Sequence, residues 1–208
     1  MDKIIFKNII FDWSGVVNDS LERHLRVVNK MFKSFGVSEI DLEELRENWE
    51  QPCLQFYRKY LPNITLEEEQ VAYAKALSES GKCNSYPGMI ELIKKLKGNG
   101  KNLIVISSDI SDALISEVRD FGLDKTFSRI VTDAHDKTKE LVKIIEKEKF
   151  NLDETVFIGD SNHEIESGKK VGIKTIAVTW GFTKKDRLFN LKPDFLVDSI
   201  SELEECLL

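Results

Sequence analysis

The sequence of 208 residues is poor in cysteine and contains no long apolar run. Its three cysteines, Cys53, Cys83 and Cys206, lie far apart and form no CxxC pair. This spacing argues against a zinc knuckle or a disulfide scaffold and favours a reducing compartment. No stretch reaches the ~18 apolar residues that a membrane-spanning helix needs, and the N-terminal segment lacks a signal-peptide pattern. We therefore expect a cytoplasmic protein that does not interact with membranes.

The sequence also lacks an excess of basic residues. Lys and Arg number 30 against 36 Asp and Glu, which gives a formal net charge of −6. This balance provides no electrostatic reason to expect nucleic acid or an anionic membrane as a partner. The length suits one core with a small second lobe, and 41% hydrophobic and 32% charged residues are typical of a soluble globular protein. We expect a monomer or a weak homodimer.

Apolar segments alternate with helical patterns in most of the chain. The apolar segments have the length and β-branched content of buried parallel strands, and they lie at residues 4–11, 103–107, 129–132, 155–158, 175–178 and, more weakly, 195–197. Helical periodicity is found between them at residues 89–97, 113–121 and 138–147. This alternation predicts a parallel sheet covered by helices on both faces, a three-layer α/β/α core.

Residues 19–84 differ from the rest because they show helical periodicity and no convincing strand. Gly36 and Pro62 interrupt this region. The economical interpretation is a small helical domain inserted after the first strand. The core domain would then consist of residues 1–18 and 85–208.

Four polar motifs lie where predicted strands end or where loops lead into helices. They are Asp12, Ser107, Lys137 and the segment from Asp160 to Glu164. In open α/β sheets, ligands bind at the carboxyl edge of the strands. We therefore expect these motifs to form one site at that edge.

The residue types of the motifs suit the transfer of a phosphoryl group. Asp12 can act as a nucleophile and form an aspartyl-phosphate. Asp12, Asp160 and Glu164 offer the hard oxygen ligands that Mg²⁺ prefers, and the cation would offset the repulsion between carboxylate and phosphate.

Other polar residues can bind the phosphate itself. Ser107, with the adjacent Ser108, can bind phosphate oxygens, and Lys137 can pair with both Asp12 and the phosphate. Lys139 is a close competitor for the role of Lys137.

Two segments carry a resemblance to a known family. Residues 9–23, IIFDWSGVVNDSLER, look like the first motif of the haloacid dehalogenase superfamily, Asp-x-Asp-Gly-(Thr/Val)-(Leu/Val)-x-Asp-Ser. Residues 159–178, GDSNHEIESGKKVGIKTIAV, are similar to its fourth motif over their whole length. The resemblance covers nearly the whole chain and implies a Rossmann-like core of the haloacid dehalogenase type.

The resemblance is closest to the subgroup with a helical cap after the first motif. This subgroup includes phosphoglycolate phosphatases, β-phosphoglucomutases, haloacid dehalogenases and phosphonoacetaldehyde hydrolases. It implies that residues 19–84 form a cap that closes over the site and selects the substrate. By that analogy Gln51, Gln55, Tyr57 and Arg58 are candidates to contact the substrate. An ordinary amphipathic helix is the simpler interpretation of these four residues.

Ser14 departs from the family's pattern, because phosphatases of the superfamily carry a second Asp at this position. The resemblance makes that Asp the general acid and base, a role worth about 10²–10⁴-fold in rate. A serine hydroxyl titrates far too high to replace it, although the Ser14 backbone carbonyl could still bind Mg²⁺. We therefore predict a Mg²⁺-dependent phosphatase that hydrolyses a small phosphorylated metabolite slowly through Asp12.

Two alternative functions stay open from the sequence. Trp13 followed by a small residue resembles the Asp-Trp-Ala-Gly of phosphonoacetaldehyde hydrolase, which cleaves a C–P bond and needs a cap lysine, for which Lys59 is a candidate. Alternatively, hydrolysis is lost and the protein binds a phosphate ligand or another protein. His24 and His163 are candidates to supply the missing proton, although helix-surface histidines are the simpler interpretation. The sequence does not identify the substrate.

Overall fold

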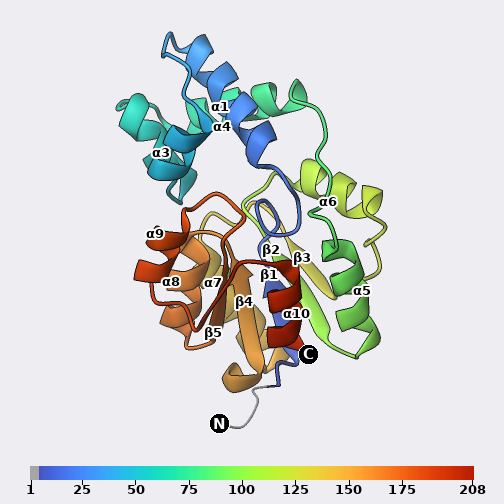
Figure 1. The fold of residues 1–208 in the computed structure, drawn as a ribbon. Helices are drawn as coiled ribbons and strands as arrows, with labels where there is room; N and C mark the ends of the chain where they lie inside the picture. The colour runs from blue at the N-terminus through green and yellow to red at the C-terminus, as the bar shows by residue number, and fades with distance from the viewer. Residues whose placement is uncertain (1–4) are drawn as a thin grey trace.

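The computed structural model describes residues 5–208, and a parallel β-sheet forms its centre (Figure 1). Within these residues six strands pair in the order β3-β2-β1-β4-β5-β6. They are β1 (Asn8–Phe11), β2 (Asn102–Ile106), β3 (Arg129–Val131), β4 (Thr155–Gly159), β5 (Lys174–Val178) and β6 (Phe195–Val197). Each overlaps one of the predicted apolar segments, which confirms the predicted α/β class. Ile4, where the first predicted segment begins, lies outside the described residues.

Helices cover both faces of this sheet. They are α5 (Met89–Gly98), α6 (Ser111–Asp120), α7 (Lys137–Glu148), α8 (Asn162–Val171), α9 (Lys185–Asn190) and α10 (Ile200–Leu207), with a short 3₁₀ turn at Leu152–Glu154. Successive strand residues point to opposite faces. Ile9 and Phe11 of β1 therefore pack in a core cluster with α5, α6 and α10. Ile10 packs in a second cluster with α7, and Ala177 of β5 packs against α8 and α9.

Strand β1 occupies the middle of the sheet, and its four residues are buried. The register pairs Asn8 with both Asn102 of β2 and Thr155 of β4. The backbone N–H of Asp12 continues this pairing, because it donates to the carbonyl of Ile158 over 2.9 Å. The segments that follow β1 and β4 therefore leave the sheet side by side at its carboxyl edge.

Residues 19–84 contain the helices α1 (Leu21–Ser34), α2 (Leu42–Asn48), α3 (Cys53–Tyr60) and α4 (Leu66–Ser78). Figure 1 shows these helices gathered at one end of the sheet, and we call them the cap. The cap has its own apolar cluster, in which Val27, Phe32 and Phe56 are fully buried. Phe182, from the loop after β5, joins the same cluster. The side chain of Phe182 thus packs between the core and the cap.

The two chain segments that connect the cap to the core lie next to each other. Asn18 forms an antiparallel bridge with Ser85, and the N–H of Asp19 donates to the carbonyl of Asn84 over 2.9 Å. The predicted domain boundaries fall at this crossing and stay a prediction. Among residues 5–208, no helix combines the length and the apolar character needed to cross a membrane.

Candidate active site

Asp12 lies at the carboxyl end of β1 and is buried beneath the loop that follows. Gly15 in this loop has a φ of +80°, and a Cβ at this position would lie 2.2 Å from Oδ2 of Asp160. A side chain cannot be placed that close to a carboxylate oxygen, and the positive φ independently favours glycine. The glycine of the first motif therefore allows the loop to approach Asp160.

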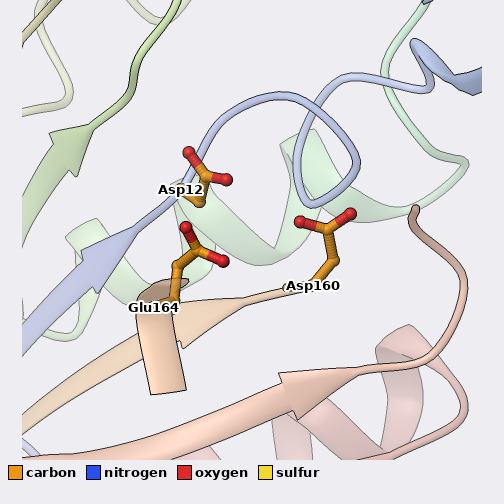
Figure 2. Close-up of side chains that lie close together, drawn as sticks. All are labelled: Asp12, Asp160 and Glu164. Carbon is orange, nitrogen blue, oxygen red and sulfur yellow. The ribbon is translucent and has the colours of Figure 1, made fainter. Parts of the chain in front are cut away.

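Asp12, Asp160 and Glu164 form a buried group of three carboxylates (Figure 2). Each offers one oxygen atom, and these atoms all lie within 4.8 Å of one another. Asp12 follows β1, Asp160 follows the neighbouring strand β4, and Glu164 belongs to the first turn of α8. The sheet topology thus assembles three residues that are up to 152 positions apart in the sequence, counting from 12 to 164.

Lys137 reaches this group from the first residue of α7 and is fully buried. Its Nζ atom lies 2.9 Å from Oδ1 of Asp12 and 2.5 Å from Oε1 of Glu164. Burial opposes the charge of this lysine, but the two carboxylates raise its pKa well above the usual range. Lys139 is exposed, so of the two lysines that the sequence offered it is Lys137 that contacts Asp12.

The site carries more negative than positive charge. Burial raises the pKa of Asp12 to about 7 although Lys137 opposes this shift, and burial also raises the pKa of Asp160 well above its usual value. For Glu164, burial opposes ionisation, but Lys137 outweighs it and lowers the pKa. Three carboxylates facing one ammonium group fit a cation bound among oxygen ligands, because a cation would balance the remaining charge.

Short contacts around Glu164 and Asp160 fix their positions. Oε2 of Glu164 accepts hydrogen bonds from the backbone N–H and the hydroxyl of Ser161 at 3.0 and 2.7 Å, which caps α8. Oδ2 of Asp160 accepts a hydrogen bond from the N–H of Phe182 at 2.6 Å. A Cβ at Gly181 would lie 2.1 Å from the same oxygen. These contacts of Gly181 and Phe182 with Asp160 were not predicted from the sequence. A glycine and an aromatic residue just after a strand could have indicated a tight loop at the carboxyl edge of the sheet.

A cavity of about 630 Å³ lies between the carboxyl edge of the sheet and the cap. Its floor includes Asp12, Ser14, Ser107 and Ser108 from the core domain. We count Lys137, Asp160 and Glu164 with the floor because they lie next to Asp12, although they do not line the cavity themselves. Its roof consists of side chains from the cap and of Phe182 from the loop after β5, and most of them are apolar or aromatic. This volume is within the range of small-molecule sites. A ligand in the cavity would contact Asp12 on one side and the cap on the other.

Comparison with known proteins identifies the family. Residues 9–178 match the family of haloacid dehalogenase-like hydrolases. The chain belongs to this family of hydrolases. It is 24% identical over 201 residues to a phosphoglycolate phosphatase of Synechococcus elongatus and 24% identical over 202 residues to a pyrophosphatase PpaX of Halalkalibacterium halodurans. Each of these alignments covers 94% of both proteins.

The fold is also similar to solved structures of this family. A haloacid dehalogenase-like hydrolase of Streptococcus pneumoniae aligns with a TM-score of 0.81 and 19% identity. The alignment covers 95% of this chain and 96% of the other. The predicted superfamily and the Rossmann-like core with parallel strands are thereby confirmed.

Ser14 of this family member contacts a carboxylate that the sequence analysis did not consider. The Ser14 hydroxyl donates to Oδ2 of Asp109 at 2.8 Å, and the Ser107 hydroxyl donates to the same oxygen at 3.0 Å. Asp109 lies two residues beyond Ser107 in the loop after β2 and also lines the cavity. A carboxylate is therefore present beside position 14, but it comes from a different loop. Its place two residues after the second motif was the only signal in the sequence.

The cap residues that the sequence analysis singled out lie in different places. Gln51 lines the cavity, and its Oε1 lies 3.3 Å from Nδ1 of His163. Tyr57 is buried in the apolar cluster of the cap, and Gln55 is exposed. Tyr57, Gln55 and Arg58 are not among the described residues that line the cavity.

The prediction that Arg58 binds the substrate is corrected by its position in the cap. Its Nε atom donates to the carbonyl of Ile64 at 3.4 Å, within the cap itself. Lys59 is likewise exposed, with its Nζ 2.8 Å from the carbonyl of Asn48 and 3.1 Å from Glu50. Both side chains are exposed, and neither lines the cavity.

The two histidines considered as substitute acids are both partly or fully removed from solvent. His24 lines the cavity, and burial, assisted by Arg23, lowers its pKa to about 3. Burial also lowers the pKa of His163. Both rings are therefore neutral near pH 7 and poor proton donors. The interpretation of His24 as a helix-surface residue was wrong, because its ring packs edge-on against Trp49 and Phe182.

Proposed function

We propose that this hydrolase is a Mg²⁺-dependent phosphatase that acts on a small phosphorylated metabolite through an aspartyl-phosphate on Asp12 and turns over slowly. The observation that carries the proposal is the buried contact of Asp12 with Lys137 beside Asp160 and Glu164, where Asp12 lines the cavity between core and cap. The names of the relatives, phosphoglycolate phosphatase and pyrophosphatase, support a phosphorylated substrate.

The reaction has two steps, and both break a bond to phosphorus. First, a carboxylate oxygen of Asp12 attacks phosphorus, and the leaving oxygen departs with the bonding electron pair and needs a proton. Second, water attacks the phosphorus of the aspartyl-phosphate, so that phosphate leaves and the Asp12 carboxylate is restored. A proton acceptor for the water completes the second step.

Each residue of the floor has a part in these steps. Lys137 holds Asp12 in place and offsets the negative charge of the phosphate, while the Ser107 and Ser108 hydroxyls can bind phosphate oxygens. Asp12, Asp160 and Glu164, with the backbone carbonyl of Ser14, would hold Mg²⁺. The bound cation would neutralise charge on the phosphoryl group.

Slow turnover follows from the absence of a carboxyl group on residue 14. A positioned acid and base contributes about 10²–10⁴-fold, and the Ser14 hydroxyl cannot supply it. Substrates whose leaving group needs little protonation, such as aryl or acyl phosphates, are affected least in the first step. The proposed enzyme should therefore hydrolyse aryl phosphates faster than alkyl phosphates.

The test is Mg²⁺-dependent release of phosphate from p-nitrophenyl phosphate and from an alkyl phosphate. The structure shows why Ser14→Asp alone is an incomplete variant: the new carboxylate would face Asp109, whose oxygen lies 2.8 Å from the Ser14 hydroxyl. We therefore include the double variant Ser14→Asp/Asp109→Asn. We expect slow release by the wild type, release about tenfold faster or more by the double variant, and a larger gain for the alkyl phosphate.

Two variants complete the design. Asp12→Asn removes the nucleophile and should abolish release, whereas Lys139→Ala, at an exposed position, should leave it unchanged. If neither the wild type nor the double variant releases phosphate, the phosphatase proposal fails.

In that case the second candidate is the better interpretation, a protein that binds a phosphate ligand without hydrolysing it. Ser14 at the position of the family's Asp favours this candidate. The alternative of a C–P bond hydrolase finds no support in the cap, because no described cap lysine lines the cavity.

A further inference from the structure

Glu69 is a buried carboxylate on the roof of the cavity, far from the acidic group in the sequence. It belongs to α4, is 8% exposed and lines the cavity. Its carboxylate has no hydrogen-bond or ion-pair partner among residues 5–208, in contrast to Glu68, which caps α4 together with Thr65. The carboxylate borders the cavity, so a ligand bound there would supply the partner that the described residues do not provide.

The surroundings of Glu69 favour a cation as the missing partner. Burial alone raises the pKa of Glu69 to about 7, which a bound positive charge would reverse. Arg23 is the only Lys or Arg among the described cavity-lining residues, and its guanidinium is already bound to Glu117 at 2.6 Å. Glu69 therefore faces a cavity that contains no free cation of the protein itself.

Aromatic rings line the same cavity as Glu69. Tyr73 lies one helical turn after Glu69 on α4, and its ring lies 5.8 Å from that of His24. The rings of Trp49 and Phe182 lie 4.8 Å apart and continue this wall. A carboxylate beside aromatic faces is the environment that binds ammonium groups, through charge pairing and cation–π contacts.

The same environment disfavours a substrate with a second anionic group. The carboxylate of a phosphorylated hydroxy acid, or the second phosphate of a pyrophosphate, would meet Glu69 and Asp109 without a free cation to pair with. The roof therefore differs from what the substrates named for the relatives would require.

We propose that the roof of the cavity, with Glu69 as counter-charge and Trp49, Tyr73 and Phe182 as aromatic wall, is a subsite for an organic cation. The ligand class is a phosphate monoester that carries an ammonium group, either a primary amine or a quaternary one. Hydrolysis of such a ligand rests on the proposed phosphatase function, but its binding does not.

The test uses two probes of the same shape, phosphocholine and 3,3-dimethylbutyl phosphate, in which a carbon atom replaces the charged nitrogen. Dissociation constants are measured by calorimetry in Mg²⁺ wherever no phosphate is released, and kcat/KM is measured wherever it is. We expect the wild type to prefer phosphocholine by about tenfold or more. Glu69→Gln should reduce this preference to about one, since it removes the charge and keeps the shape.

Two further variants separate a charge effect from a structural one. Glu67→Gln, at an exposed position of the same helix, should keep the full preference, and Glu69→Asp should keep a part of it. Circular dichroism checks that each variant is folded. 2-Aminoethyl phosphate, as a third probe, distinguishes a primary from a quaternary ammonium group.

The outcomes for the subsite and for the phosphatase proposal are distinguishable. Three results would overturn the cation subsite. They are equal affinity of the wild type for both probes, no binding of either probe to the wild type, and a preference for phosphocholine that Glu69→Gln leaves unchanged. Release of phosphate from both probes at equal rates leaves the phosphatase proposal standing and removes the subsite. A Glu69-dependent preference in binding without any release supports the subsite, and release from p-nitrophenyl phosphate by the wild type and the double variant then decides the phosphatase proposal separately.

Discussion

The floor and the roof of the cavity are built in different ways. On the floor, Asp12, Asp160, Glu164 and Lys137 contact one another or the backbone, and the loops that carry them leave no space around Gly15 and Gly181. On the roof, aromatic and apolar side chains predominate, and the Glu69 carboxylate has no partner among the described residues. The floor is thus a closed network of charges, whereas the roof is an apolar surface with one unsatisfied charge.

This difference separates the chemistry of the site from its selectivity. A closed network holds its groups in fixed positions, as a phosphoryl transfer requires. An apolar roof with a single carboxylate contributes no chemistry to the transfer but can distinguish one leaving group from another. We therefore expect changes on the floor to affect both stability and turnover, and changes on the roof to affect mainly which ligand binds.

Loss of Lys137 should have the largest effect. Lys137→Met leaves the buried carboxylates of Asp12 and Glu164 without their ammonium partner, so we expect a loss of about 3–5 kcal/mol in stability and about 10²–10³-fold in kcat. Urea unfolding and phosphate release measure the two effects. Lys139→Met, at an exposed position, should change stability by no more than about 0.5 kcal/mol. Equal effects of both variants would contradict the assignment of Lys137.

Phe182 tests how strongly the floor and the roof depend on each other. Its backbone N–H binds Asp160, and its ring packs in the apolar cluster of the cap. Phe182→Ala should cost about 3 kcal/mol in the free energy of unfolding, because it leaves a cavity between cap and core. Phe189, which is 67% exposed, provides the control, and Phe189→Ala should cost about 0.5 kcal/mol or less. A small effect of Phe182→Ala would show that the cap docks without this ring.

Binding of Mg²⁺ should stabilise the wild type through the floor alone. At a concentration of about 100 times the dissociation constant, Mg²⁺ should add about 2.7 kcal/mol, visible as a higher melting temperature than in EDTA. Asp160→Asn should lose this shift, whereas Asp124→Asn, at an exposed position outside the site, should retain it. In EDTA, Asp160→Asn should be at least as stable as the wild type, because it removes one of three crowded carboxylates. A full shift with Asp160→Asn would place the cation elsewhere.

Asp109 should give the smallest effect of the four. Asp109→Ala leaves the hydroxyls of Ser14 and Ser107 without their shared acceptor, and we expect a loss of about 1–2 kcal/mol in stability. Asp109→Asn keeps an acceptor oxygen and should lose less. Chemical denaturation of the two variants measures the difference. If both variants match the wild type, these hydroxyls find other partners and the contact contributes little.

The floor could be predicted from the sequence to a large extent. Asp12 and Asp160 each follow a recognisable buried strand, and Glu164 lies four residues further, in the first turn of the next helix. Such positions depend on local features: a strand that ends, a glycine that permits a tight loop and a helix that begins. The strands were predicted for the same reason. The bounds of β6 match the prediction, whereas other strands differ at one or both ends, as at the start of β1.

The roof could not be predicted in the same way. Arg58 was a candidate to contact the substrate, but its Nε donates to the carbonyl of Ile64 within the cap, and no feature of the sequence singled out Glu69 among the glutamates of α4. The side of a cap helix that faces the core depends on how four helices pack together. Helical periodicity shows that a helix has an apolar face, but not which polar residue at its margin lies above the site.

The sequence by itself determined the parallel α/β core, the helical insertion and the motif residues at the carboxyl edge of the sheet. These features arise from periodicity and from turns between residues close in the chain. The tertiary structure decided that Lys137 rather than Lys139 reaches Asp12, that Asp109 contacts Ser14, and that Phe182 and Glu69 face the cavity. Each of these features joins segments far apart in the chain: the sheet topology brings Lys137 to Asp12 and Asp109 to Ser14, whereas the packing of the cap against the core brings Phe182 and Glu69 to the cavity.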